Sequence, residues 1–256
     1  QALQLVDRSQ VNSIFNIDRD LGLQLHGSFK AGNVVIRPIF AIAKGEGRNV
    51  ISTNIGGFSY TGKLELLPLG EFSSKGDYFE ADLSREDKPK LSIAAAANYN
   101  HGASRQTQTG AFLIDTAGEY MTNNLLTVFA DMMFKYKGFS FLTEYAFKQT
   151  LLQNGQSLSV TDSTLISADG KTYRTGYGIS AQAGYLFKHD IELAARYTRV
   201  VPDWSKSFTS SDEYTVGLSK YIVGHKLKVQ TDVTLVDEFN EPDYSVRYRL
   251  QVEVSF

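Results

Sequence analysis

The last thirteen residues, 244–256, alternate between apolar and polar side chains without interruption. Tyr248 and Leu250 share one parity, whereas Arg247 and Arg249 lie on the other. Side chains of a β-strand point alternately to its two faces, so this segment has one apolar face and one charged face. A strand of this kind that ends on an aromatic residue is typical of the closing strand of a membrane-spanning β-barrel.

The same two-residue period recurs along the whole chain, in segments long enough to cross a bilayer as tilted strands of about ten residues. Short turns alternate with longer polar stretches, of which the longest are 44–57, 101–125, 149–175 and 202–213. This alternation predicts an all-β, antiparallel, up-and-down transmembrane barrel with short periplasmic turns and long extracellular loops. Eleven segments show the pattern: 21–30, 34–43, 58–68, 91–100, 126–136, 139–148, 177–187, 191–201, 214–222, 226–237 and 244–256.

The connection 69–89 departs from the alternation, because it is long but falls on the periplasmic side. Its middle, 78–83, offers a twelfth strand and an even count. Adding that strand would invert the sides of the short link 31–33 and the long loop 44–57, so we expect eleven strands.

Eleven strands cannot close a barrel by themselves, because the first runs from the outside to the periplasm and requires an ascending strand before it. An open barrel would leave unpaired backbone groups in lipid, at several kcal/mol each. We therefore expect the missing wall to precede Gln1 or to come from another chain. On this interpretation residues 1–19 are an entry segment, and residues 20–256 are the carboxy-terminal portion of one barrel domain.

The composition is compatible with a β-barrel and argues against several other classes of protein. The chain has 256 residues, a formal net charge of −2, a mean hydropathy of −0.22 and no cysteine. No apolar run approaches the roughly 20 residues of a membrane-spanning helix. The low mean hydropathy does not argue against a barrel, because half of the residues in each strand face a polar lumen. The slightly negative charge, without a basic surface, argues against nucleic acid as a partner.

Cations are modestly in excess on the parity predicted to face the lumen. Rings of charged side chains bias which ions dwell in a pore, so this excess predicts a preference for anions. The alternative is that these cations pair with acids on the wall, as Lys63 with Glu65 or Arg249 with Glu253. Together with two arginines of the entry segment, the pore-lining and anion-binding candidates are Arg8, Arg19, Lys30, Arg37, Lys63, Lys148, Arg196, Lys228, Arg247 and Arg249.

The four histidines provide no catalytic arrangement. His189 and His225 fall in short turns and His26 in the lumen, while His101 begins an outer loop close to Ser104 without an orienting partner. Neither metal-ligand spacing nor a phosphate-binding glycine loop occurs. We therefore expect no enzyme activity, no metal and no cofactor.

Two stretches of the chain carry a family resemblance. In the first, LVDRSQVNSIFNIDRDLGLQLHG, the matching residues are Asp7, Arg8, Ser9, Arg19, Asp20, Leu21 and Gly22. In the second, 63–91, they are LELLPLGEF and then Arg85, Pro89, Lys90 and Leu91, which resemble a periplasmic crossing. Both stretches resemble the phosphate-selective porins of the porin O and porin P type found in Bacteroidota. The resemblance implies a sixteen-stranded, usually trimeric, porin, of which this sequence holds eleven strands.

These observations lead to two hypotheses about function. The first is an outer-membrane porin for passive diffusion of small solutes, with a modest preference for anions such as phosphate. The alternative is a structural or accessory barrel within a larger outer-membrane complex for secretion, import or assembly. The expected partners are outer-membrane lipid, small anionic solutes, and either a homotrimer or a hetero-complex of outer-membrane proteins.

Overall fold

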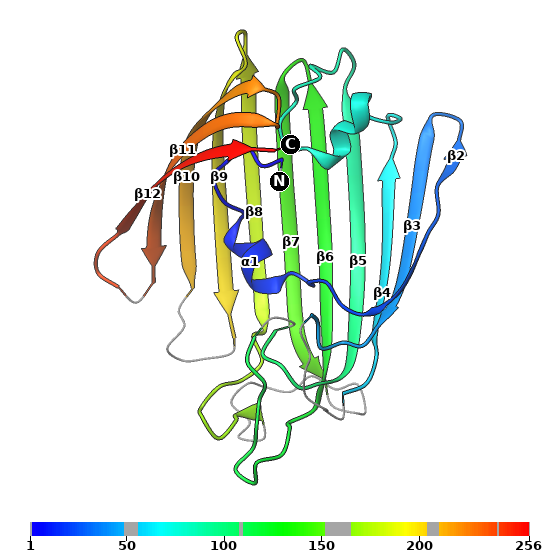
Figure 1. Cartoon of the computed structure of the whole chain (residues 1–256), viewed down its shortest axis with the longest axis vertical. Helices are drawn as coiled ribbons and strands as arrows, with labels where there is room; N and C mark the ends of the chain where they lie inside the picture. Colours follow the sequence, from blue (N-terminus) through cyan, green and yellow to red (C-terminus); the bar gives the residue numbers. More distant parts are fainter. Residues whose placement is uncertain are drawn as a thin grey trace.

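The computed structural model describes residues 2–48, 56–107, 110–151, 165–203, 210–239 and 241–255. It contains one antiparallel sheet of twelve strands, in which each strand from β3 onward pairs with its neighbours in the chain (Figure 1). The predicted all-β, up-and-down architecture is confirmed. The strands are β1 (Gly22–His26), β2 (Phe29–Ala31), β3 (Val34–Ala43), β4 (Ser59–Leu67), β5 (Lys90–Ala103), β6 (Asn123–Tyr136), β7 (Phe139–Leu151), β8 (Gly176–Phe187), β9 (Ile191–Pro202), β10 (Ser211–Val223), β11 (Leu227–Glu238) and β12 (Ser245–Val254).

The twelfth strand arises from a break in the first predicted segment. β1 and β2 both pair with β3, and they are separated opposite Pro38, whose carbonyl accepts a hydrogen bond from Gly27 N at 2.9 Å. Proline has no N–H to donate, so the ladder is weakened at this point. Residues 78–83 form no strand. A 3-10 helix, η1 (Ser73–Tyr78), precedes them instead.

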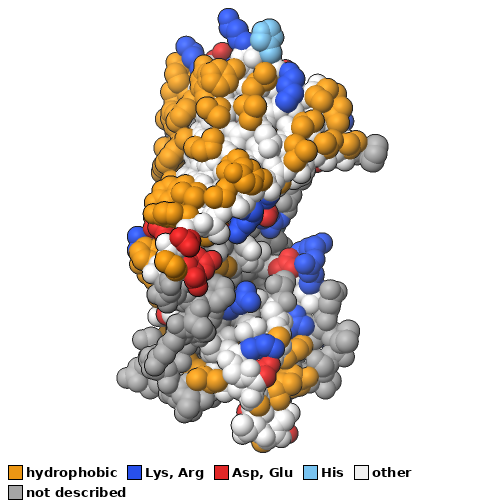
Figure 2. Space-filling view, turned by 90° about the vertical axis from the view of Figure 1, so that its left-hand side faces the viewer, with side chains coloured by type: hydrophobic (Ala, Val, Ile, Leu, Met, Phe, Trp, Pro, Cys, Tyr) orange, Lys and Arg blue, Asp and Glu red, His pale blue; other side chains and the backbone are white. Residues whose placement is uncertain are grey.

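The sheet is curved, and its two faces differ as the alternation predicts. In β10, Val216 and Leu218 are 54% and 49% exposed on the convex face, whereas Thr215 and Ser219 are 1% and 2% exposed on the concave face. Figure 2 shows hydrophobic side chains over much of the outer surface, with Lys, Arg and His side chains at one rim. Large apolar side chains are therefore exposed on the convex face, and most of the strand side chains buried on the concave face are polar.

The two ends of the sheet also differ. Tight turns such as Lys137-Gly138 and Gly224 lie at one end, at the top of Figure 1, which we call the short-turn end. The opposite end, the long-loop end, carries the other longer connections, whereas the long connection between β4 and β5 lies at the short-turn end. β1 and β12 are the two edges of the sheet, which is not closed. The described residues therefore form an open curved wall.

The concave side of this wall is occupied by residues 2–20, which we call the luminal segment (Figure 1). Its helix α1 (Gln10–Phe15) begins at Ser9, whose hydroxyl caps the helix by accepting a hydrogen bond from Asn12 N at 3.0 Å. The segment starts near the short-turn end and reaches the long-loop end, where Asp20 accepts a hydrogen bond from Gly45 N at 2.6 Å. The ascending passage before β1 is therefore inside the wall and is not a strand of it.

Within the described part of the chain, no helix has the length and apolar character needed to cross a membrane.

Candidate functional site: the concave face and its luminal segment

Gln4 anchors the luminal segment to the concave face near the short-turn end. Its amide nitrogen donates to Glu192 Oε1 at 2.6 Å and to Ser140 Oγ, and its amide oxygen accepts from Gln182 Nε2 at 2.7 Å. Its backbone carbonyl accepts from Ser219 Oγ at 2.8 Å. Gln230 of β11 donates to the same carbonyl at 2.9 Å, so five strands, β7 to β11, hold one buried glutamine.

Three glycines of the wall make room for this close approach. A Cβ atom on Gly217 would lie 2.5 Å from Leu5 Cδ2, and one on Gly178 would lie 2.8 Å from Val11 Cγ2. A Cβ on Gly184 would overlap the amide of Gln4. Glycine inside a strand often marks the place where another backbone comes close. Here the glycines of β8 and β10 determine where the luminal segment lies.

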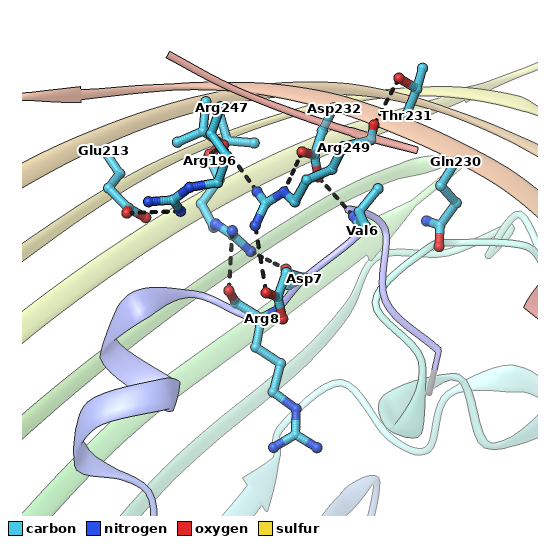
Figure 3. Close-up of polar contacts among 12 residues, drawn as sticks. Val6, Asp7, Arg8, Arg196, Glu213, Gln230, Thr231, Asp232, Arg247 and Arg249 are labelled. Atoms are coloured by element: carbon cyan, nitrogen blue, oxygen red, sulfur yellow. Dashed lines mark hydrogen bonds and ion pairs between the residues drawn. The ribbon is translucent and has the colours of Figure 1, made fainter. Parts of the chain in front are cut away.

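Two predicted pore cations, Arg196 and Arg249, bind the luminal segment directly (Figure 3). Arg196 donates to the carbonyl oxygens of Asp7 at 2.9 Å and Arg8 at 3.3 Å. Arg249 Nε donates to Asp232 Oδ1 at 2.7 Å, and its Nη1 lies 3.5 Å from Asp7 Oδ2. These two arginines therefore bind groups of the protein itself, on the luminal segment and on the wall.

Asp232 completes this cluster by accepting a hydrogen bond from Val6 N at 2.9 Å. The side chain of Arg8 extends away from the cluster (Figure 3), and its Nη1 donates to Asn12 Oδ1 at 3.3 Å. Arg247 forms a longer ion pair of 3.5 Å with Glu213.

Most other predicted cations also have acidic partners. Lys228 is fully buried, 3.1 Å from Glu253 Oε2, and donates to Leu3 O at 2.8 Å. Further pairs are Arg37 with Glu65 at 3.1 Å and with Asp77 at 2.5 Å, exposed Lys30 with Glu71 at 3.1 Å, and exposed Arg19 with Asp18 at 3.8 Å.

Pairing of the wall cations was the alternative left open by the sequence, but the partners differ from the two suggested pairs. The register explains the difference. Glu65 lies directly opposite Arg37, whereas Arg249 lies opposite Asp232. Directly opposed residues are the closest neighbours on one face of a sheet, closer than residues two positions apart on one strand.

Lys63 and Lys148 make no hydrogen bond or ion pair with the described residues. Lys148 is 5% exposed, lies on β7 towards the long-loop end, and is close enough to Arg174 for their charges to repel. Lys63 and Lys148 are therefore predicted pore cations without an ion pair to the described residues, and Lys148 is the one near the long-loop end.

A cavity of about 500 Å³ lies beside α1, between the luminal segment and the wall. Its lining includes Phe129, Met133 and Leu142, which are apolar residues on the concave face of β6 and β7. Its charged groups are two cations and three carboxylates: Lys63, Arg196, Glu80, Asp131 and Glu144.

The connection between β4 and β5 folds over the short-turn end. Lys135 Nζ donates to three of its carbonyl oxygens, those of Gly76 and Phe79 at 2.7 Å and of Ala81 at 2.9 Å. His225 stacks on Phe79 with ring centroids 5.1 Å apart. Burial, together with the charge of nearby Lys228, lowers the pKa of His225 to about 4, because both disfavour the protonated ring.

The described residues contain no group of three or more His, Asp or Glu side chains that could hold a metal ion. Comparisons with protein-family models, curated proteins and solved structures found no match. The site is therefore interpreted from its own geometry.

Sequence reasoning missed Gln4, and it placed Asp232 among the inward-facing acids without its role in holding the luminal segment. A signal for the luminal segment is present in the chain. Gly178, Gly184 and Gly217 all fall on the polar parity of their strands, where a missing side chain indicates a close backbone approach.

Proposed function

We propose that this chain forms part of the wall of an outer-membrane β-barrel through which small solutes diffuse passively. The observation that carries the proposal is the reversal of burial, with an apolar convex face and a polar concave face along successive strands. Exposed apolar surface costs about 25 cal/mol per Å² in water, a cost that lipid removes. The concave face, lined by charged and amide groups, suits a path for water and polar solutes.

The open edges define what the complete barrel requires. β1 and β12 each pair on one side only, and in lipid their free N–H and C=O groups need further strands as partners. We propose that upstream strands or another chain supply them, as the resemblance to sixteen-stranded, trimeric porins implies.

We further propose that the path prefers anions, and that the residues responsible for this preference lie at the long-loop end. Arg37, Arg249 and Lys228 are neutralised by acids, so they add little to the field of the path. Lys148 and Arg174 repel one another, and neither forms an ion pair with a carboxylate among the described residues. An anion such as phosphate entering from that end would be attracted to both.

Planar-bilayer recording of the full-length protein tests the proposal. We expect stable open conductance, with a reversal potential in a salt gradient that favours anions. Lys148→Gln should shift that potential towards cations, whereas Lys188→Gln, an exposed lysine in the β8–β9 turn, should shift it much less. Absence of any open conductance would reject the porin, and an unchanged potential in Lys148→Gln would reject the assignment of selectivity.

A second function is favoured by the unpaired edges of β1 and β12, which could dock strands of another protein. In this alternative the chain is an accessory barrel of a secretion, import or assembly complex. Co-purification of a stable hetero-complex from membranes, together with absence of conductance, would support it over the porin.

A further inference from the structure

We propose that the cavity beside α1 is a binding site for a small amphipathic cation, an ammonium group carried on an apolar or aromatic body. This inference goes beyond passive diffusion, because it assigns a preferred ligand class to one place on the concave face.

The floor of the cavity is unusual for a wall that faces polar solutes. Phe129 and Met133 on β6 and Leu142 on β7 all point to the concave side, and Val11 of α1 and Ile39 of β3 add to the lining. A pocket of this size with mostly hydrophobic walls and a few polar groups is typical of sites for small organic molecules.

Carboxylates stand beside this apolar floor. Asp131 and Glu144 are directly opposed in the β6–β7 register, and both line the cavity. Glu144 accepts a hydrogen bond from Ser9 Oγ, which leaves Asp131 as the exposed carboxylate. Among the described residues Asp131 makes no hydrogen bond and no ion pair, so its carboxylate oxygen atoms can accept hydrogen bonds from a ligand.

The cations of the cavity form no ion pair with Asp131 or Glu144 in the described structure. Arg196 is turned to the carbonyl oxygens of Asp7 and Arg8, and Lys63 lies two strands away from Asp131, where its charge acts on that carboxylate without an ion pair. With three carboxylates against two cations, the cavity attracts positive charge. An anion entering the cavity would be repelled by the carboxylates of Asp131 and Glu144.

The spacing of the groups defines the shape of the ligand. Phe129 and Asp131 are two residues apart on one strand, hence on the same face and about 7 Å apart. Leu142 and Glu144 repeat this arrangement on the neighbouring strand. An aromatic ring resting on the floor can therefore extend an ammonium group to the carboxylates through a linker of about two carbon atoms.

Ligand-detected NMR on the purified full chain in nanodiscs tests the site with three probes that differ only in the head group. They are phenethylamine, which is a cation at pH 7, neutral 2-phenylethanol and anionic 3-phenylpropanoate. We expect phenethylamine to bind most tightly. Asp131→Asn should weaken it about tenfold, the scale of one charge interaction in a partly wet site, and should leave 2-phenylethanol unchanged.

Two further variants distinguish binding in the cavity from general electrostatic attraction of the ligand to the protein surface. Asp243→Asn removes an equal charge from an exposed position in the β11–β12 connection, and we expect no effect on binding. Ala96→Met keeps every charge but fills part of the cavity, and we expect binding to be lost.

The proposal is overturned if the three probes bind alike, or if Asp131→Asn and Asp243→Asn behave alike. It is also overturned if Ala96→Met binds phenethylamine as wild type does. None of these measurements depends on conductance. The binding-site proposal can therefore be rejected while the porin proposal is supported, and the porin proposal can be rejected while the binding site is supported.

Discussion

Individual residues show how the wall accommodates charge on its buried face. Lys228, Arg249 and Arg196 are each matched by a carboxylate or by carbonyl oxygens. Such matching is required because a buried charge that loses its partner costs about 3–5 kcal/mol. Most of the lysines and arginines that the sequence predicts to line the pore therefore form contacts within the protein that stabilise its fold.

His225 gives a prediction about pH at this scale. Its pKa is about 4 in the folded chain, below the ordinary 6.5, so the unfolded chain binds the proton more readily. The contribution of the neutral ring to stability is complete above about pH 6.5 and is lost as the pH falls through 4. We expect the urea midpoint of unfolding to fall between pH 7 and pH 5, and His225→Phe to reduce that fall because it keeps the stack on Phe79 without a titrating group.

The matched control is His26→Phe, at an exposed position in β1. Circular dichroism of both variants and the wild type, unfolded in urea at each pH, makes the comparison. An equal fall in the His225→Phe variant and the wild type would contradict the role given to this ring.

At the scale of elements, the alternation of the sequence predicts the strands well because one face of each is apolar throughout. Each of the eleven predicted segments coincides with one strand of the sheet, except that the first is split into β1 and β2, and a few segments begin or end one residue beyond their strand. Phe256, the last predicted residue, is outside the described residues. The strands extend beyond the predicted bounds, as in β7 to Leu151 and β10 from Ser211. The luminal segment could not be found this way, since its contacts join residues up to 227 positions apart.

Gly217 provides a prediction about how that segment is held. Gly217→Val places side-chain atoms where Leu5 lies, and such overpacking typically costs about 1–3 kcal/mol. We expect the luminal segment to leave the wall, so that trypsin cleaves after Arg8 faster and conductance rises. Gly62→Val is the control, because a Cβ there meets nothing within 4 Å. Equal cleavage in both variants would show that the glycine has no part in placing the segment.

The whole molecule is a wall with two unlike faces, and its proposed place in a membrane depends on which face touches lipid. Leu64 and Lys63 are neighbours at one depth of β4 that point to opposite faces, and Leu64 is 46% exposed. The chain has no cysteine, so each position can carry a single cysteine-linked fluorophore.

In lipid vesicles we expect a quencher attached to lipid chains to dim the probe of Leu64→Cys several-fold more than that of Lys63→Cys. Aqueous iodide should give the opposite order, because the concave face is wetted by the solute path. This reversal depends only on the parity of the strand and holds whatever strands pair with β1 and β12. Two probes that respond alike to both quenchers would place the apolar face against protein, and the proposal of a membrane wall would be wrong.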